Sequence, residues 1–174
     1  FNPDELTVDE QISLHSSLTG FYFFTHDFER AYEYAKQWVA LFDENPSYKR
    51  AKIEMYIRAV NNLMMAQSKL GMYTEYTLAL QSFREVLDTK EFKLTPNVRT
   101  TLFKHTATHS LNKFFLEGCF TEGCKIIPDM AKELALYEHK LNTHYIMILY
   151  YKFASMYFGN DDYKTSAMWL TRII

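Results

Sequence analysis

The sequence predicts an all-α solenoid built from repeated pairs of antiparallel helices. Apolar residues recur three and four positions apart along most of the chain, which is the period of a helix with one buried face. Short helix-breaking stretches interrupt this pattern, and an aromatic residue follows four of them at spacings of 45, 47 and 43 residues: Phe28, Tyr73, Phe120 and Tyr163. No segment alternates apolar and polar residues over the length of a strand, so we expect no sheet.

Composition narrows the class of protein. The chain has 174 residues, of which 48% are hydrophobic and 23% charged, so it can form one folded domain with a substantial core. Its net charge of -2 argues against a broad nucleic-acid-binding surface. The two cysteines, Cys119 and Cys124, fit a reducing compartment, and we expect a cytoplasmic protein. No apolar run approaches the roughly 20 residues that cross a bilayer, so we expect no membrane contact.

The first predicted unit opens with a capping box, in which Thr7 and Glu10 would satisfy each other's exposed backbone N–H groups. Apolar residues then follow at close to helical spacing: Ile12, Leu14, Leu18, Phe21 and Tyr22. A turn at His26-Asp27 leads into a second helix over about 28–42. Its buried face is predicted to carry Ala31, Ala35, Trp38 and Phe42.

The second unit is predicted to open at Ser47, as an N-cap, and to break at Gly71. The apolar stripe of its first helix consists of Ile53, Tyr56, Ile57, Val60, Leu63, Met64 and Leu70. The returning helix carries Tyr73, Tyr76, Leu80, Phe83 and Leu87. A polar connection is expected over 90–94.

The third unit begins at Thr95, a predicted cap followed by Pro96 in the first turn, and breaks at Gly118. Its stripe consists of Val98, Leu102, Leu111, Phe114 and Phe115. The partner helix carries Phe120, Ile127, Met130, Leu134 and Tyr137, and Pro128 is expected to kink or restart it.

The fourth unit starts near Asn142-Thr143 and turns at 159–161. The residues expected to face inward on its first helix are Ile146, Leu149, Tyr150, Phe153, Ala154 and Tyr157. Those expected on the partner helix are Tyr163, Ala167, Leu170 and Ile173.

Two segments carry a resemblance to a known family. The stretch FYFFTHDFERAYEYAKQWVALFDENP, which follows Gly20, and the final YYKFASMYFGNDDYKTSAMWLTRII resemble tetratricopeptide repeats. The resemblance covers about 8–174. It implies one domain over 1–174, a right-handed helical-repeat (TPR-like) solenoid of about four antiparallel pairs and seven to eight helices, with units at about 8–46, 47–94, 95–140 and 142–174.

The chain also departs from that family. Its repeats are nearer 45 residues than the usual ~34. The second unit has Gln67 where the family has an aromatic residue, and Tyr76 where the family has a small one. The third unit has Gly123 at the position that corresponds to Tyr76. The long, aromatic-rich units resemble a group of bacterial tetratricopeptide proteins from which no activity can be carried over. Of the positions that form a carboxylate clamp in some family members, only Asn62 fits here, so no clamp is predicted.

The resemblance implies that partners bind the concave face, which the first helix of each unit lines. The predicted partner-binding residues are Arg58, Asn61, Met65, His105, Thr108, Asn112, Phe115, Ile148, Tyr151, Ser155 and Phe158. We expect Arg58, Phe115 and Tyr151 to contribute most, because aromatic and arginine side chains are enriched at interfaces.

These observations predict a non-catalytic protein–protein interaction scaffold that binds a peptide or helix segment. The alternative is a ligand- or peptide-responsive regulatory sensor attached to an output domain. RNA binding is disfavoured by the net charge. No cofactor is expected, and no motif for enzymatic catalysis is present. The Asp161-Asp162 pair is better explained as a helix cap than as an acid–base pair.

A metal site is one open possibility. His105 and His109 are four residues apart and share a helix face, and Cys119 and Cys124 follow, so a mixed zinc site is conceivable. The neighbouring threonines favour a merely polar face, and no metal is predicted.

The chain has no initiator Met and ends inside an amphipathic pattern, so we expect a fragment of a longer protein. Four apolar residues near the end lack the polar cap of a terminal repeat: Trp169, Leu170, Ile173 and Ile174. We therefore expect this face to pair with further helices or with a second copy, as a homodimer.

Overall fold

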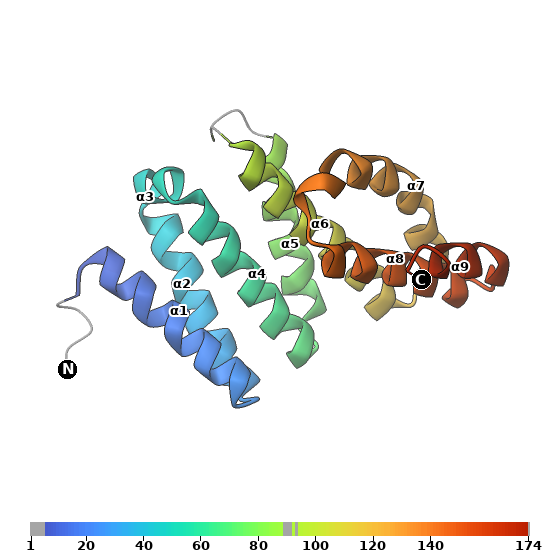
Figure 1. Ribbon diagram of the computed structural model, residues 1–174. Helices are drawn as coiled ribbons and strands as arrows, with labels where there is room; N and C mark the ends of the chain where they lie inside the picture. Colours follow the sequence, from blue (N-terminus) through green and yellow to red (C-terminus); the bar gives the residue numbers. More distant parts are fainter. Residues whose placement is uncertain (1–5, 89–91, 93, 174) are drawn as a thin grey trace. The chain divides into compact units, whose positions relative to one another are not determined.

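The structure is a computed structural model that describes residues 6–88, 92 and 94–173. Within these residues the chain forms nine α-helices and one short 3-10 helix, with no strand (Figure 1). The all-α prediction is therefore confirmed. The chain divides into two compact units, 1–94 and 95–174, and each contains two of the predicted helix pairs. The single-domain and solenoid arrangements stay predictions.

The first unit contains five helices in chain order: α1 (Val8–Phe24), α2 (Phe28–Glu44), α3 (Pro46–Ala51), α4 (Ile53–Leu70) and α5 (Tyr73–Asp88). The long helices pack sequentially, α1 on α2, α2 on α4 and α4 on α5 (Figure 1). Most of the 90–94 connection lies outside the described residues.

The predicted start of the first helix pair and the buried face of its second helix are confirmed. Thr7 forms the capping box with Glu10. All four residues predicted for the buried face of α2 are buried: Ala31, Ala35, Trp38 and Phe42. Phe21 on α1 departs from the prediction, because its side chain is 56% exposed.

The predicted start of the second pair was wrong. Ser47 is not an N-cap but lies inside α3, a short helix that Pro46 begins at its first position. Proline favours this position because its fixed φ suits the helix and its missing N–H is not needed there. The chain then bends at Lys52 before α4 begins.

The second unit contains α6 (Pro96–Glu117), α7 (Phe120–Tyr137), a 3-10 turn (Glu138–Lys140), α8 (Thr143–Gly159) and α9 (Tyr163–Leu170). Successive helices again pack on each other, and α6 also lies beside α8. The predicted caps are confirmed, because the side chains of Thr95 and Asn142 accept the N–H groups of Val98 and Tyr145. Pro128 lies within a continuous α7, so it does not restart the helix.

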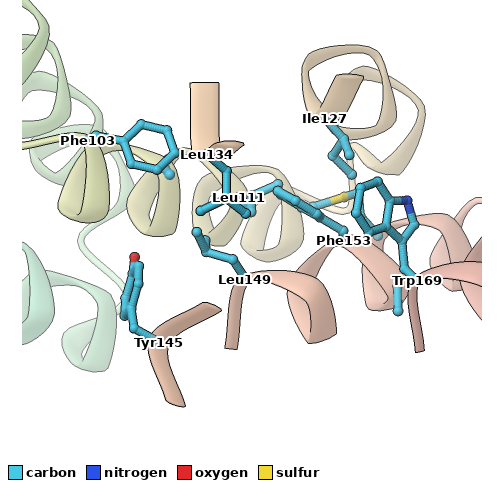
Figure 2. Close-up of a cluster of buried hydrophobic side chains, with 11 residues drawn as sticks. Phe103, Leu111, Ile127, Leu134, Tyr145, Leu149, Phe153 and Trp169 are labelled. Carbon is cyan, nitrogen blue, oxygen red and sulfur yellow. The ribbon is translucent and has the colours of Figure 1, made fainter. Parts of the chain in front are cut away.

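Figure 2 shows the core of the second unit as a row of apolar side chains from α6, α7, α8 and α9. Leu111, Leu149 and Phe153 occupy its middle. Trp169 closes one end, with its ring centroid 4.9 Å from that of Phe153 in an edge-to-face contact. All four α-helices of this unit therefore contribute to its core.

The four predicted hairpins share one turn. In each, a residue with positive φ ends the first helix: His26, Gly71, Gly118 and Asp161. The next N–H donates 2.9 Å to the carbonyl five residues earlier, as in Asp27 to Tyr22 and Asp162 to Tyr157. This is the Schellman arrangement, which satisfies the free carbonyls of a helix end. The repeating aromatic is the first residue of the returning helix. The spacing of these aromatics in the sequence is therefore the spacing of the turns.

An aromatic pair spans three of these turns. The first residue of the returning helix meets, edge to face, the aromatic five residues before it. The pairs are Phe23–Phe28 at 6.0 Å, Phe115–Phe120 at 5.3 Å and Phe158–Tyr163 at 5.3 Å between ring centroids. Such pairs stabilise by about 0.5–1.5 kcal/mol beyond the area they bury. The second hairpin has Ser68 in the earlier place.

The predicted face of α9 was wrong. Ser166 and Trp169 are buried, whereas Ala167 and Leu170 are exposed. The Trp169 ring packs on Tyr150 and Phe153 of α8, so the helix turns this residue, and not Leu170, toward the core. Positions three and six after Tyr163 are therefore the buried ones. Trp169 therefore belongs to the core and not to an uncapped surface.

Candidate functional site

The second unit contains an apolar pocket of about 460 Å³. It lies beside the α6–α7 turn and the end of α8, and α9 forms its far side. The lining residues come from all four helices: Phe115, Phe120, Tyr151, Ala154, Ser155, Phe158, Gly159, Ser166 and Leu170.

The pocket exists because small residues on α8 and α9 face large rings. Ala154, Ser155 and Ser166 leave space that a larger side chain would fill. Gly159 is required sterically, because a β-carbon there would lie 2.5 Å from Cδ1 of Phe120. The absence of a side chain at 159 therefore lets the Phe120 ring pack directly against the end of α8.

The aromatic walls are partly open to solvent. Tyr151 is 62% exposed, Phe158 63% and Phe115 48%. The hydroxyl of Ser155 donates to the Tyr151 carbonyl at 2.9 Å, so this polar group of the lining already has a partner. A site of this kind can bury an apolar side chain, and its exposed rings can cover the neighbouring surface of a partner.

A polar row continues from the pocket along the contact between α6 and α8. The Tyr145 hydroxyl donates to the Lys104 carbonyl and contacts the Thr108 hydroxyl. In the same row, Lys152 Nζ donates to Asn112 Oδ1 at 2.5 Å. Burial raises the pKa of Tyr145 to about 12 and lowers the pKa of Lys152. Tyr145 therefore stays neutral at physiological pH.

The two histidines of α6 are desolvated. His109 is 3% exposed, and its ring centroid lies 6.5 Å from that of His105. Burial lowers the pKa of His105 to about 4 and of His109 to about 3, so both are neutral near pH 7. Cys119 and Cys124 are free thiols. Across the described residues no three His, Cys, Asp or Glu side chains gather to hold a metal ion, so these four residues do not form a zinc site there.

The structure places the predicted binding residues in three settings. Four of them line the pocket: Phe115, Tyr151, Ser155 and Phe158. Thr108 and Asn112 belong to the polar row, while His105 and Ile148 are half-buried beside it. The other three lie on α4 of the first unit, where Arg58 and Met65 are exposed and Asn61 Nδ2 lies 3.5 Å from Met65 Sδ. Their role in binding stays a prediction.

Sequence reasoning missed five lining residues and the pocket's basic neighbour. The missed residues are Phe120, Ala154, Gly159, Ser166, Leu170 and Lys152. The prediction projected one face of each first helix, so it could not include residues from the returning helices. One signal was available in the sequence of α8. Small residues at 154 and 155 lie between the aromatics at 151 and 158, and a third small residue follows at 159.

Comparison with protein-family models, with characterised proteins and with solved structures finds no match. None of the helices in the described part of the chain is long and apolar enough to cross a membrane. The candidate site therefore has to be interpreted from its own geometry.

Proposed function

We propose that the protein is a non-catalytic interaction scaffold that binds a peptide or helix segment of a partner protein over α6 and α8. In this proposal the four hairpins form a TPR-like solenoid, and the pocket receives an apolar side chain of the partner. The observation that carries the proposal is the pocket itself, in which small residues on α8 and α9 lie between exposed aromatic walls.

The shape of the site favours a macromolecular partner over a small ligand. Its volume of about 460 Å³ is within the range of ligand pockets. However, Tyr151 and Phe158 extend the apolar surface beyond the cavity along an exposed side of α8. An extended groove with a central pocket is the usual receptor for an amphipathic segment, whose anchors fall at helical spacing. Aromatic residues around such a pocket carry a large share of binding energy.

The test is affinity capture from native lysate followed by mass spectrometry, with wild type and a Tyr151→Ala/Phe158→Ala variant of confirmed helicity. A Leu136→Ala variant is the matched control, because Leu136 is 68% exposed on α7 of the same unit and does not line the pocket. We expect a partner that wild type and the control enrich and the double variant loses. Equal enrichment with all three proteins would refute the assignment of the pocket.

A further inference from the structure

The pair of helices that borders the pocket has an unusual charge composition. Over α6 and α8 the basic residues are Arg99, Lys104, Lys113 and Lys152, and the acidic ones are limited to Glu117. Glu117 is already engaged, because its carboxylate lies 2.6 Å from Lys113 Nζ. These two helices therefore carry a net positive charge, although the whole chain has a net charge of -2.

Lys152 is the basic residue nearest to the pocket in the chain, between two lining positions on α8. It follows Tyr151 directly and precedes Ser155 by less than one turn. Its ammonium donates to Asn112 Oδ1, and among the described residues no carboxylate forms an ion pair with it. An ammonium has three donors, and an amide oxygen satisfies one of them without neutralising the charge.

A half-buried charge without a counter-ion is unfavourable, because burial removes water and nothing of opposite sign replaces it. An incoming carboxylate would form a charge-assisted hydrogen bond to the remaining donors. Because Lys152 is half-buried, water has limited access to its ammonium, which would strengthen that bond.

We propose that the occupant of the site is an acidic amphipathic segment of a partner protein, with an apolar side chain in the pocket and an Asp or Glu side chain on Lys152. This inference rests on the proposed function and adds the chemistry of the partner. Charge complementarity carries it: α6 and α8 carry the exposed aromatics Phe115, Tyr151 and Phe158 together with four basic residues, and Glu117, the acidic residue of these two helices, is already paired with Lys113. Basic partners would be rejected, because like charges would meet over α6 and α8.

The test is selection of a displayed library of random peptides of about 15 residues on the full chain, since isolated helices become stable near that length. Peptides lost on the Tyr151→Ala/Phe158→Ala variant are retained as pocket-dependent. We expect these peptides to be enriched in Asp and Glu. Their synthetic versions carry amidated C-termini, so a terminal carboxylate cannot substitute for a side chain.

A double-mutant cycle then tests the contact itself. Lys152→Met removes the charge but keeps the aliphatic stem, and we expect about tenfold weaker binding of an acidic peptide. Changing the critical Glu of the peptide to Gln should weaken binding to wild type by a similar factor and to Lys152→Met hardly at all. Lys152→Arg should retain binding. Lys132→Met is the control, because Lys132 is 79% exposed on α7.

The outcomes separate the two proposals. Pocket-dependent peptides without acidic enrichment, or additive effects in the cycle, would overturn the acidic partner and leave the proposed function intact. No pocket-dependent peptide would overturn both. A single-stranded oligonucleotide that binds with the same dependence on Tyr151, Phe158 and Lys152 would also overturn both, because aromatic and basic side chains can stack on bases and pair with phosphates. Unchanged helicity and melting of each variant exclude a loss of fold.

Discussion

The ring of Phe120 occupies the space that a side chain on Gly159 would need. A β-carbon on Gly159 would lie 2.5 Å from Cδ1 and 2.6 Å from Cε1 of Phe120. Beside this contact, the Thr121 hydroxyl donates to Asn160 Oδ1 at 2.7 Å. Together these interactions join the start of α7 to the end of α8, and the Phe120 ring becomes one wall of the pocket.

The first prediction concerns this contact. Gly159→Ala should destabilise the second unit by about 1–3 kcal/mol, because the ring must move and the surrounding helices resist. Part of this loss is offset, since alanine is favoured over glycine in a helix by roughly 0.5–1 kcal/mol. Denaturant unfolding followed by Trp169 fluorescence in a Trp38→Phe background measures it, since Trp38 lies in the other unit.

Two other glycines serve as comparisons for that prediction. At Gly123 a β-carbon would lie 2.4 Å from Sδ of the fully buried Met156, so Gly123→Ala should also destabilise the second unit. At Gly20, inside α1, a β-carbon would meet nothing within 4 Å, so Gly20→Ala should stabilise the first unit. A Gly159→Ala protein as stable as wild type would contradict the steric argument.

The hairpins could be predicted because their signals are local. The capping box at Thr7, the caps at Thr95 and Asn142, and the breaks at Gly71 and Gly118 each depend on residues within one helical turn. The pocket could not be predicted in the same way. It depends on which residues of α7 and α9 meet α8, and helical periodicity along one segment does not specify its neighbour.

The second prediction concerns the left-handed residues of the turns. Gly71 has φ +72°, and a β-carbon there would meet nothing within 4 Å. Gly71→Ala therefore tests backbone conformation alone and should cost about 1–2 kcal/mol. His26 has φ 61° in the equivalent place, and His26→Gly should stabilise by up to about 1 kcal/mol. Denaturant unfolding, followed by Trp38 fluorescence in a Trp169→Phe background, measures the free energy of unfolding of both variants. Changes of the opposite sign would contradict the conclusion that the hairpins share one turn.

The last helix shows why periodicity alone can assign the wrong face. Ala167 and Leu170 continue an apolar pattern, as do Ser166 and Trp169 if serine is allowed in the core. In the structure the second set is buried, because the Trp169 ring packs on Phe153 of α8. The small residue three positions after the repeating aromatic is also Ser166, equivalent to Ala31 in the first hairpin. Alignment on Tyr163 could have found it.

The third prediction concerns acid stability. His105 and His109 have pKa values of about 4 and about 3, below the usual 6.5. Burial is the main cause for both, Lys104 adds to it at His105, and His105 and Lys152 add to it at His109. Below pH 6.5 the unfolded chain therefore binds protons that the folded chain does not. Stability from these groups is complete above pH 6.5 and declines as pH falls toward 4 for His105 and toward 3 for His109. Unfolding of the second unit measured from pH 7.5 to 4 should show this loss.

A substitution isolates the contribution of His109. His109→Gln should lessen the dependence of unfolding free energy on pH by up to about 1.4 kcal/mol per pH unit between pH 6 and 4. The slope, and not the stability at pH 7, is the readout, because His109 also has interactions that glutamine changes. An unaltered slope in the variant would mean that His109 is accessible to protonation in the folded chain.

The final prediction tests the place of Trp169. Its ring packs on Phe153 at 4.9 Å and the Arg172 guanidinium lies 4.7 Å above it, which makes it part of the core of the second unit. Trp169→Ala should therefore cost about 3–5 kcal/mol. Trp169→Phe should cost far less. The indole N–H of Trp169 is buried without a hydrogen-bond partner in the described part of the chain, and phenylalanine removes that unsatisfied group.

Circular dichroism against denaturant, at two protein concentrations, measures the stability of both variants. If Trp169 instead formed an interface between copies, its loss would change the mass in light scattering and make the unfolding midpoint depend less on concentration, with little change in the stability of the single chain.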